Sequence, residues 1–203
     1  MTSASLTRVV LIGAMLSLTA FSAGAQGEAR TPFSLPTPEG WRNETIPFPL
    51  GFAPELDYTG VEELRFAPGM FTPGAEDYWT YAFVWWISLD TDPGVERLQA
   101  DLEAYFFGLT RVVARGKGFD PGNPTYEAKL SRIDEGDPAR LRGRVLTFDA
   151  FAAREPVELN VRIDNLACKD QGQRGLVFLL SPQTEEHEVW RTLERIRDGF
   201  RCE

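Results

Sequence analysis

The sequence predicts an α+β fold, in which one antiparallel sheet of about six strands is flanked by two main helices. Three observations lead to this class. Residues 78–89 are apolar and aromatic, most of residues 125–180 alternate apolar with polar side chains, and two segments carry apolar residues at steps of three and four. The expected element order is β-β-α-β-β-β-β-α, and we expect it to form a single-domain sandwich.

Residues 1–25 have the layout of a secretory signal peptide. Arg8 is their only charged side chain, and the apolar run from Val9 to Phe21 follows it. Ala23 and Ala25 place small residues at the two positions that a signal peptidase inspects. The run is shorter than the roughly 20 residues of a membrane-spanning helix. We therefore expect cleavage after Ala25, no membrane insertion afterwards and a periplasmic or secreted protein, the alternative being an uncleaved N-terminal anchor.

The charge of the chain limits its partners. Its formal net charge is −9 at pH 7. Nucleic acids and anionic membranes both favour a basic patch, so neither is expected as a partner. An unknown protein or a small molecule remains, and we expect a monomer.

The two cysteines, Cys168 and Cys202, are expected to form a disulfide bond. Cysteines in an oxidising compartment usually pair, and this bond would close a loop of about 35 residues, worth on the order of 3–4 kcal/mol. The alternative is a redox pair or a pair of metal thiolates. The wide spacing and the absence of a CxxC motif disfavour it.

Residues 26–60 are expected to form a proline-rich, extended segment packed on the body of the protein, which residues 61–203 make up. Proline lacks an amide donor and fixes φ, so it suits an edge or an extended path. A short strand over Val61–Phe66 follows. The run Tyr78–Leu89 is apolar on both of its faces, which is typical of a central strand covered on both sides.

Two helices are expected. Asp92 is a suitable N-cap for the first, with Pro93 at its first position and an end near Arg115. The second is expected to begin at Thr184. Four consecutive antiparallel strands are expected between the helices, over residues 125–133, 140–151, 157–164 and 176–180.

Most named chemistries lack their residues. Zinc needs several histidine or cysteine ligands, and the chain has one histidine, His187, and two cysteines that we expect to be paired. No serine lies in Gly-x-Ser-x-Gly, and no P-loop is present. His187 is expected to be a solvated surface residue. We expect no metal and no cofactor.

Paired carboxylates would leave no local signature, so they stay open as an alternative. The acids that flank the aromatic strand, Glu62, Glu63, Asp77 and Asp90, are the candidates for such catalysis. The competing interpretation treats them as solvated acids at the edge of the sheet.

The concentration of aromatic residues is the most unusual feature of the sequence. Such a block can form a pocket for a ring or an apolar ligand, or it can be core. The central strand favours core. A contact surface is expected at Phe66, Met70, Phe71, Trp79 and Tyr81, because the loop 66–71 is hard to bury completely.

The element order carries a resemblance to a known group. The chain resembles the PsbP/Mog1-like domains in the following order of features: Pro-Glu-Gly-Trp (Pro38 to Trp41), a long mid-chain helix, a meander, a strand ending in Ser-Pro and a helix ending in Ile-Arg-Asp-Gly-Phe (Ile196 to Phe200). The resemblance implies a three-layer α/β/α sandwich and, in exported members, a non-catalytic accessory role. The aromatic block and the cysteine pair are not hallmarks of that group, so no residue role is carried over. The same features also suit a separate family of exported bacterial proteins.

The sequence therefore favours an exported, soluble protein that binds a ligand or a partner without catalysis. The alternatives are a hydrolase with two carboxylates near residues 78–89 and a structural component of the cell envelope.

Overall fold

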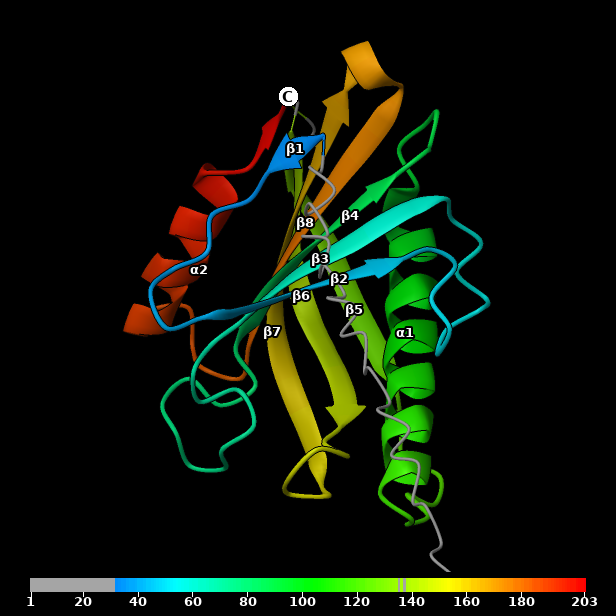
Figure 1. The fold of residues 1–203 in the computed structure, drawn as a ribbon, viewed down its shortest axis with the longest axis vertical. Coiled ribbons are helices and arrows are strands. Elements are labelled where there is room, and N and C mark those ends of the chain that lie inside the picture. Colours follow the sequence, from blue (N-terminus) through cyan, green and yellow to red (C-terminus); the bar gives the residue numbers. More distant parts are fainter. Residues whose placement is uncertain (1–31, 135, 137) are drawn as a thin grey trace, which may run out of the picture. The chain divides into compact units, whose positions relative to one another are not determined.

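A seven-stranded antiparallel sheet organises the chain in the computed structural model (Figure 1), which describes residues 32–134, 136 and 138–203. The strands lie in the order β2-β3-β4-β8-β7-β6-β5. The predicted signal peptide falls outside the described residues. The elements of the fold are β1 (Phe33–Ser34), β2 (Arg42–Pro47), β3 (Gly60–Phe66), β4 (Tyr81–Ile87), α1 (Gly94–Gly116), β5 (Glu127–Asp134), β6 (Ala139–Phe148), β7 (Pro156–Cys168), η1 (Lys169–Gln171), β8 (Gln173–Ser181), α2 (Glu188–Asp198) and β9 (Arg201–Cys202).

The predicted α+β class is confirmed, and so is the meander of four strands, which run β5 to β8 as antiparallel neighbours. The sheet has one strand more than the sequence indicates. The extra strand is β2, which the proline-rich segment contributes by pairing with β3 along its whole length. Its prolines did not suggest a strand, but Pro47 ends β2 at the edge of the sheet, where a missing amide costs little.

The two helices cover opposite faces of the sheet. Successive residues of β4 point to opposite faces of the sheet, so each face has its own hydrophobic core. Tyr81, Phe83 and Trp85 pack on the side of α1, and Ala82, Val84 and Trp86 pack on the side of α2. All seven residues of β4 are buried, as expected for a central strand covered on both sides. The result is a three-layer α/β/α sandwich.

Most element boundaries differ from the expected ones by one to four residues, and three of these differences have a clear local cause. The central strand begins at Tyr81 rather than Tyr78, because Trp79 has a positive φ of 50° and belongs to the preceding turn. The second helix begins at Glu188, where the His187 side chain caps it by accepting from the Val189 amide at 3.2 Å. His187 is therefore a half-buried cap rather than a solvated residue. Asp92 does accept from an amide at the start of α1, but Pro93 occupies the cap position itself.

The helix α1 lies toward one end of its face of the sheet. The side chains of Gln99 and Glu103 accept from the amides of Leu130 and Ala128 at 2.8 and 3.0 Å, so α1 covers the free edge of β5. The other end of the same face, over β2 and β3, is covered by loops instead. No helix in the described part of the chain is long and apolar enough to cross a membrane.

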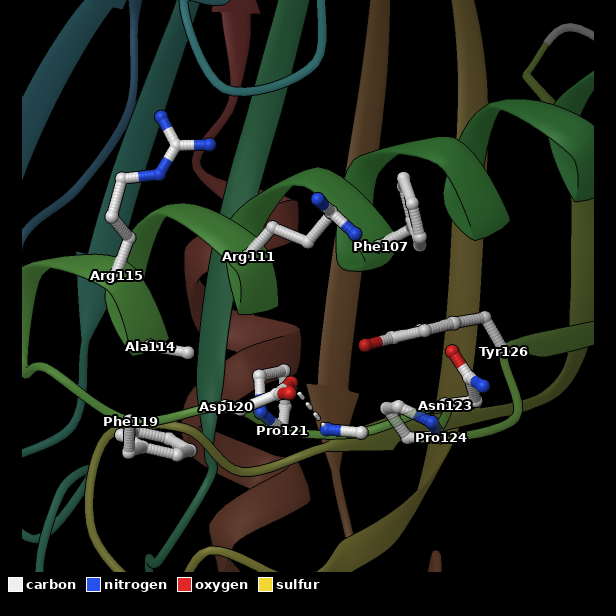
Figure 2. A pocket seen from close by; sticks show the side chains of 11 residues that line it. Phe107, Arg111, Ala114, Arg115, Phe119, Asp120, Pro121, Asn123, Pro124 and Tyr126 are labelled. Carbon is white, nitrogen blue, oxygen red and sulfur yellow. Dashed lines mark hydrogen bonds between the residues drawn. The ribbon is translucent and has the colours of Figure 1, made fainter.

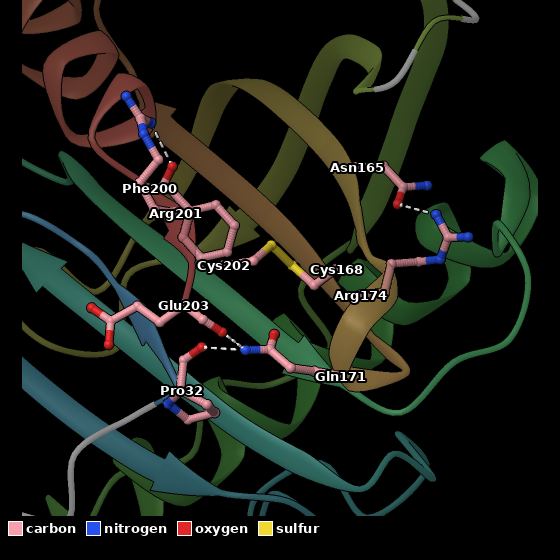
Figure 3. The surroundings of a disulfide bond; sticks show 9 residues. All are labelled: Pro32, Asn165, Cys168, Gln171, Arg174, Phe200, Arg201, Cys202 and Glu203. Carbon is pink, nitrogen blue, oxygen red and sulfur yellow. Dashed lines mark hydrogen bonds between the residues drawn. A yellow bond between two sulfur atoms is a disulfide. The ribbon is translucent and has the colours of Figure 1, made fainter.

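The predicted disulfide bond is confirmed. It joins Cys168 at the end of β7 to Cys202 in β9, with a Cα–Cα distance of 5.7 Å (Figure 3). The side-chain amide of Gln171 donates to the backbone oxygen of Pro32 at 3.2 Å and to that of Glu203. Since β9 pairs with β1, these contacts join the last strand to the first described one.

Removing the disulfide bond should lower the stability of the fold. In the double variant Cys168→Ala/Cys202→Ala we expect the free energy of unfolding to fall by about 3–4 kcal/mol, because the unfolded chain regains the entropy of a 34-residue loop. Urea unfolding measures the loss, and reduction of the wild-type chain should reproduce it. A double variant as stable as the oxidised wild type would show that the bond contributes nothing.

Candidate functional site

A cavity of about 420 Å³ lies on the α1 side of the sheet, at the end that α1 leaves to the loops. Its size is within the range of small-molecule sites, about 300–1,000 Å³. Its walls bring together all five residues of the contact surface expected from the sequence. These residues are Phe66, Met70, Phe71, Trp79 and Tyr81. We call this space the aromatic cavity.

The other walls come from segments far apart in the sequence. The aromatic cavity is also lined by Ile46 from β2, Phe52 from the segment before β3, Tyr105 and Leu109 from α1, and Phe151 from the turn after β6. The sequence analysis did not find these residues, because no local pattern shows that they meet.

Strand register brings side chains of β2, β3 and β4 to one face. Arg42 lies opposite Phe66, and Phe66 lies opposite Tyr81, so all three share the helix side of the sheet. Two residues further along, Glu44 lies opposite Leu64 in the same way. The exposed Arg42 guanidinium stacks over the Phe71 ring at 5.2 Å. The aromatic cavity therefore has an apolar body with two charged side chains on its edge strand.

The loop of residues 67–80 forms one wall and is held by its own hydrogen bonds. The Trp79 amide donates to the Met70 carbonyl at 3.1 Å. The Asp77 carboxylate accepts from the Gly69 amide at 2.9 Å. Asp77, one of the candidate catalytic acids, therefore has a structural partner that closes the loop.

Phe151 is positioned by a buried carboxylate. Asp149 accepts from the amides of Phe151, Ala152 and Ala153 at 2.8, 3.1 and 2.6 Å, and from the Tyr78 hydroxyl. Burial raises the pKa of Asp149, but these hydrogen bonds outweigh it and hold the pKa below its usual value. An aspartate at the end of a strand is a turn signal, and it could have been recognised in the sequence.

Glu62 is fully buried on the same side of the sheet as the aromatic cavity. The Trp85 indole donates to its Oε1 at 3.1 Å, whereas its Oε2 has no hydrogen-bond partner in the described chain. Burial raises the pKa of Glu62 to about 8, although Trp85 and the nearby Tyr105 hydroxyl favour the ionised form. Tyr105 lies close to the carboxyl without reaching full hydrogen-bond geometry.

The four candidate catalytic acids do not share a pocket. Glu62 and Glu63 are neighbours on β3 and point to opposite faces, and Glu63 pairs with Arg65 at 2.5 Å. Asp77 closes its loop, and Asp90 is exposed. The interpretation as solvated edge acids is wrong for Glu62 and Glu63, because the neighbouring strand β2 and its loops cover β3.

Gly108 in α1 allows a close approach of the segment that carries Phe52. A Cβ atom at this position would lie 1.9 Å from the Phe52 carbonyl oxygen. We expect Gly108→Ala to push Phe52 away from α1 and to lower the free energy of unfolding by about 1–3 kcal/mol. Gly116→Ala in the same helix meets nothing within 4 Å and is the matched control. Equal melting temperatures for the two variants would contradict this packing.

A second cavity, of about 370 Å³, lies between the C-terminal half of α1 and the loop before β5 (Figure 2). Phe107 and Arg111 of α1 border it, with the loop of residues 119–124 opposite. Phe107 is 44% exposed, and Asp120 already accepts from the Gly122 amide. This space is more polar than the aromatic cavity, because Arg111, Arg115 and Asp120 line it.

Metal ligands are not gathered at either place. Within residues 32–134, 136 and 138–203, no group of three or more histidine, cysteine, aspartate or glutamate residues is arranged to hold a metal ion.

Comparison with known proteins adds a likeness of fold. The sequence matches no protein-family model and no curated protein. Among solved structures, the chain is similar to the Ran-binding protein Mog1p of Saccharomyces cerevisiae, with a TM-score of 0.39 and 13% sequence identity. The match covers 84% of this chain and 90% of that chain. This likeness concerns the fold alone.

Proposed function

We propose that this chain is an exported, non-catalytic binding protein whose ligand is a small, mainly apolar molecule held in the aromatic cavity. The observation that carries the proposal is that aromatic and aliphatic side chains from five separate parts of the chain line a space of about 420 Å³. A space of this size and composition is typical of small-molecule sites.

The surroundings of the aromatic cavity favour binding over catalysis. Asp77 and Glu63 are engaged in hydrogen bonds or ion pairs, and Asp90 lies elsewhere on the surface. Glu62 is the one candidate acid near the aromatic cavity, and the other acid of its wall, Glu44, is exposed on the edge strand. Export is supported by the leader-like N-terminus and by the disulfide bond, since disulfide bonds persist in oxidising compartments.

Binding can be tested with a neutral fluorescent probe, N-phenyl-1-naphthylamine. We expect saturable binding to one site per chain, with enhanced emission because the probe leaves water. Leu109→Trp places a larger side chain in the wall of the aromatic cavity and should weaken binding at least ten-fold. Val112→Trp adds the same side chain to the exposed side of the same helix, where Val112 is 46% exposed, and should leave binding unchanged.

Two results would refute the proposal. One is the absence of saturable binding by the wild-type chain. The other is an equal affinity of the Leu109→Trp and Val112→Trp variants, which would place the probe outside the aromatic cavity. Circular dichroism of both variants confirms that each is folded.

A further inference from the structure

The wall of the aromatic cavity holds a buried hydrogen-bond donor without an acceptor. The Tyr81 side chain lines the aromatic cavity and is 2% exposed, and its hydroxyl has no hydrogen-bond partner in the described chain. A buried hydroxyl without a partner loses its hydration and regains nothing, which costs about 1–3 kcal/mol. Such groups are rare in native proteins, so this one calls for a physical explanation.

A second donor lies in the same wall. The Trp79 indole N–H is buried and also lacks a partner of good geometry. The Tyr78 hydroxyl, which donates to Asp149, is close enough to the indole N–H to be affected by it, and its oxygen can still accept. Trp79 also has a positive φ of 50°, a conformation that costs a non-glycine residue about 1–3 kcal/mol. The turn therefore keeps this side chain in the wall at a cost in stability.

No acceptor of the described chain lies within hydrogen-bond distance of the Tyr81 hydroxyl, and Glu62 Oε2, which is nearby and also unpaired, does not reach it. The rings that pack on Tyr81 include Phe66, Phe83 and Trp79, which offer no acceptor oxygen. Burial and the nearby Glu62 raise the pKa of Tyr81 well above 10, so its hydroxyl keeps its proton and can donate.

The charges nearby disfavour an anionic group at this position. Glu44 lies in the wall, and Glu62 is close enough to both Tyr81 and Tyr105 to affect their titration. Arg42, the cation of the wall, is exposed and stacks on Phe71. A neutral acceptor would satisfy the Tyr81 hydroxyl without facing the Glu44 carboxylate, whereas Glu62, with its pKa raised to about 8, is mainly protonated at neutral pH.

We propose that the aromatic cavity selects ligands that join an apolar or aromatic body to a neutral hydrogen-bond acceptor, such as a ketone, ester or ether oxygen. This oxygen accepts from the Tyr81 hydroxyl. The inference rests on the proposed function, because it concerns the same cavity and specifies the chemistry of its ligand.

The test uses two probes of nearly equal shape, 2-acetylnaphthalene and 2-ethylnaphthalene, which differ in one carbonyl oxygen. Each is titrated against bound N-phenyl-1-naphthylamine to give a dissociation constant. The measured quantity is the dissociation constant of 2-ethylnaphthalene divided by that of 2-acetylnaphthalene. Comparing this ratio between variants cancels the different hydration of the two probes in water.

The decisive variant is Tyr81→Phe, which removes only the hydroxyl. We expect the ratio to fall about three- to ten-fold relative to the wild type, as for the loss of one hydrogen bond. The affinity for 2-ethylnaphthalene should stay constant or rise. The melting temperature should be equal or higher, because the variant lacks an unpaired buried hydroxyl.

Tyr126→Phe is the matched control. The Tyr126 hydroxyl is also buried without a partner, but it lines the second cavity, so its removal should leave the ratio unchanged. If the ratio for Tyr81→Phe stays within two-fold of the wild-type ratio, this inference is overturned. The proposed function would still stand. Failure of both naphthalenes to displace the fluorescent probe, with that probe bound in the aromatic cavity, would overturn the inference as well. Failure of the fluorescent probe itself to bind would refute the proposed function first.

Discussion

Replacing Glu62 with glutamine should make the protein more stable at pH 9 and should remove most of the loss of stability that the wild type shows between pH 4.5 and 8. In the folded chain burial raises the pKa of Glu62 to about 8, against an ordinary value of 4.5. Between these two values the folded state binds more protons than the unfolded state. Stability therefore falls as the pH rises through this window, and it is constant above it.

The size of the effect follows from the shift in pKa. Each unit corresponds to about 1.4 kcal/mol, so Glu62 destabilises the ionised protein by on the order of 5 kcal/mol. Glutamine keeps the shape of the side chain and an oxygen that can accept from Trp85. Urea unfolding at a series of pH values measures the difference between variant and wild type. This difference isolates Glu62, because Asp164, whose pKa burial also raises, contributes equally to both chains.

Glu158→Gln is the control for loss of a surface charge. Glu158 lies on β7 in an exposed ion pair with Arg144, which is worth at most about 1 kcal/mol. This variant should keep the pH dependence of the wild type. A Glu62→Gln variant that keeps the wild-type slope would show that Glu62 is hydrated in solution.

Replacing Asp149 with alanine should destabilise the protein by about 3–5 kcal/mol at neutral pH. The carboxylate accepts from three consecutive amides and from the Tyr78 hydroxyl, and hydrogen bonds to a charged acceptor contribute about 1.5–3 kcal/mol each. Alanine leaves all four donors without this acceptor, and only some of these donors can turn to water. Because Phe151 belongs to the released turn, the affinity of the aromatic cavity for N-phenyl-1-naphthylamine should fall as well.

Asp120→Ala tests whether this loss is specific. Asp120 is exposed and accepts from a single amide, that of Gly122, so its replacement should cost less than about 1 kcal/mol. Thermal and urea unfolding compare the two variants. Because the pKa of Asp149 is lowered in the folded chain, its contribution to stability is present above about pH 4 and is lost as the pH falls through the folded pKa. Equal losses for the two aspartates would contradict the role of Asp149.

The sequence predicted those elements whose periodicity is strong. The alternation in residues 157–163 identified a strand, because a buried face requires the same parity along a whole strand. The apolar run of residues 78–89 identified another, because a central strand is covered on both faces. The strand β2 was missed because it is short, exposed and rich in polar residues, so it has no apolar face to reveal it. Its pairing with β3 is a property of the folded chain.

The aromatic cavity could be predicted only in part. The loop 66–71 and the aromatic block identified Phe66, Met70, Phe71, Trp79 and Tyr81, all of which line it. Contributions from Phe52, Leu109 and Phe151 depend on how distant segments pack. The burial of Glu62 was missed for the same reason, since the cover over β3 is provided by β2 and by loops.

The most direct test of this account is a crystal structure of the protein grown with 2-acetylnaphthalene. We expect the naphthalene rings in the aromatic cavity, in contact with Phe66, Phe71 and Phe151, with the carbonyl oxygen within about 3 Å of the Tyr81 hydroxyl. A ligand bound elsewhere, or side chains of Phe71 and Phe151 that fill the space themselves, would contradict it.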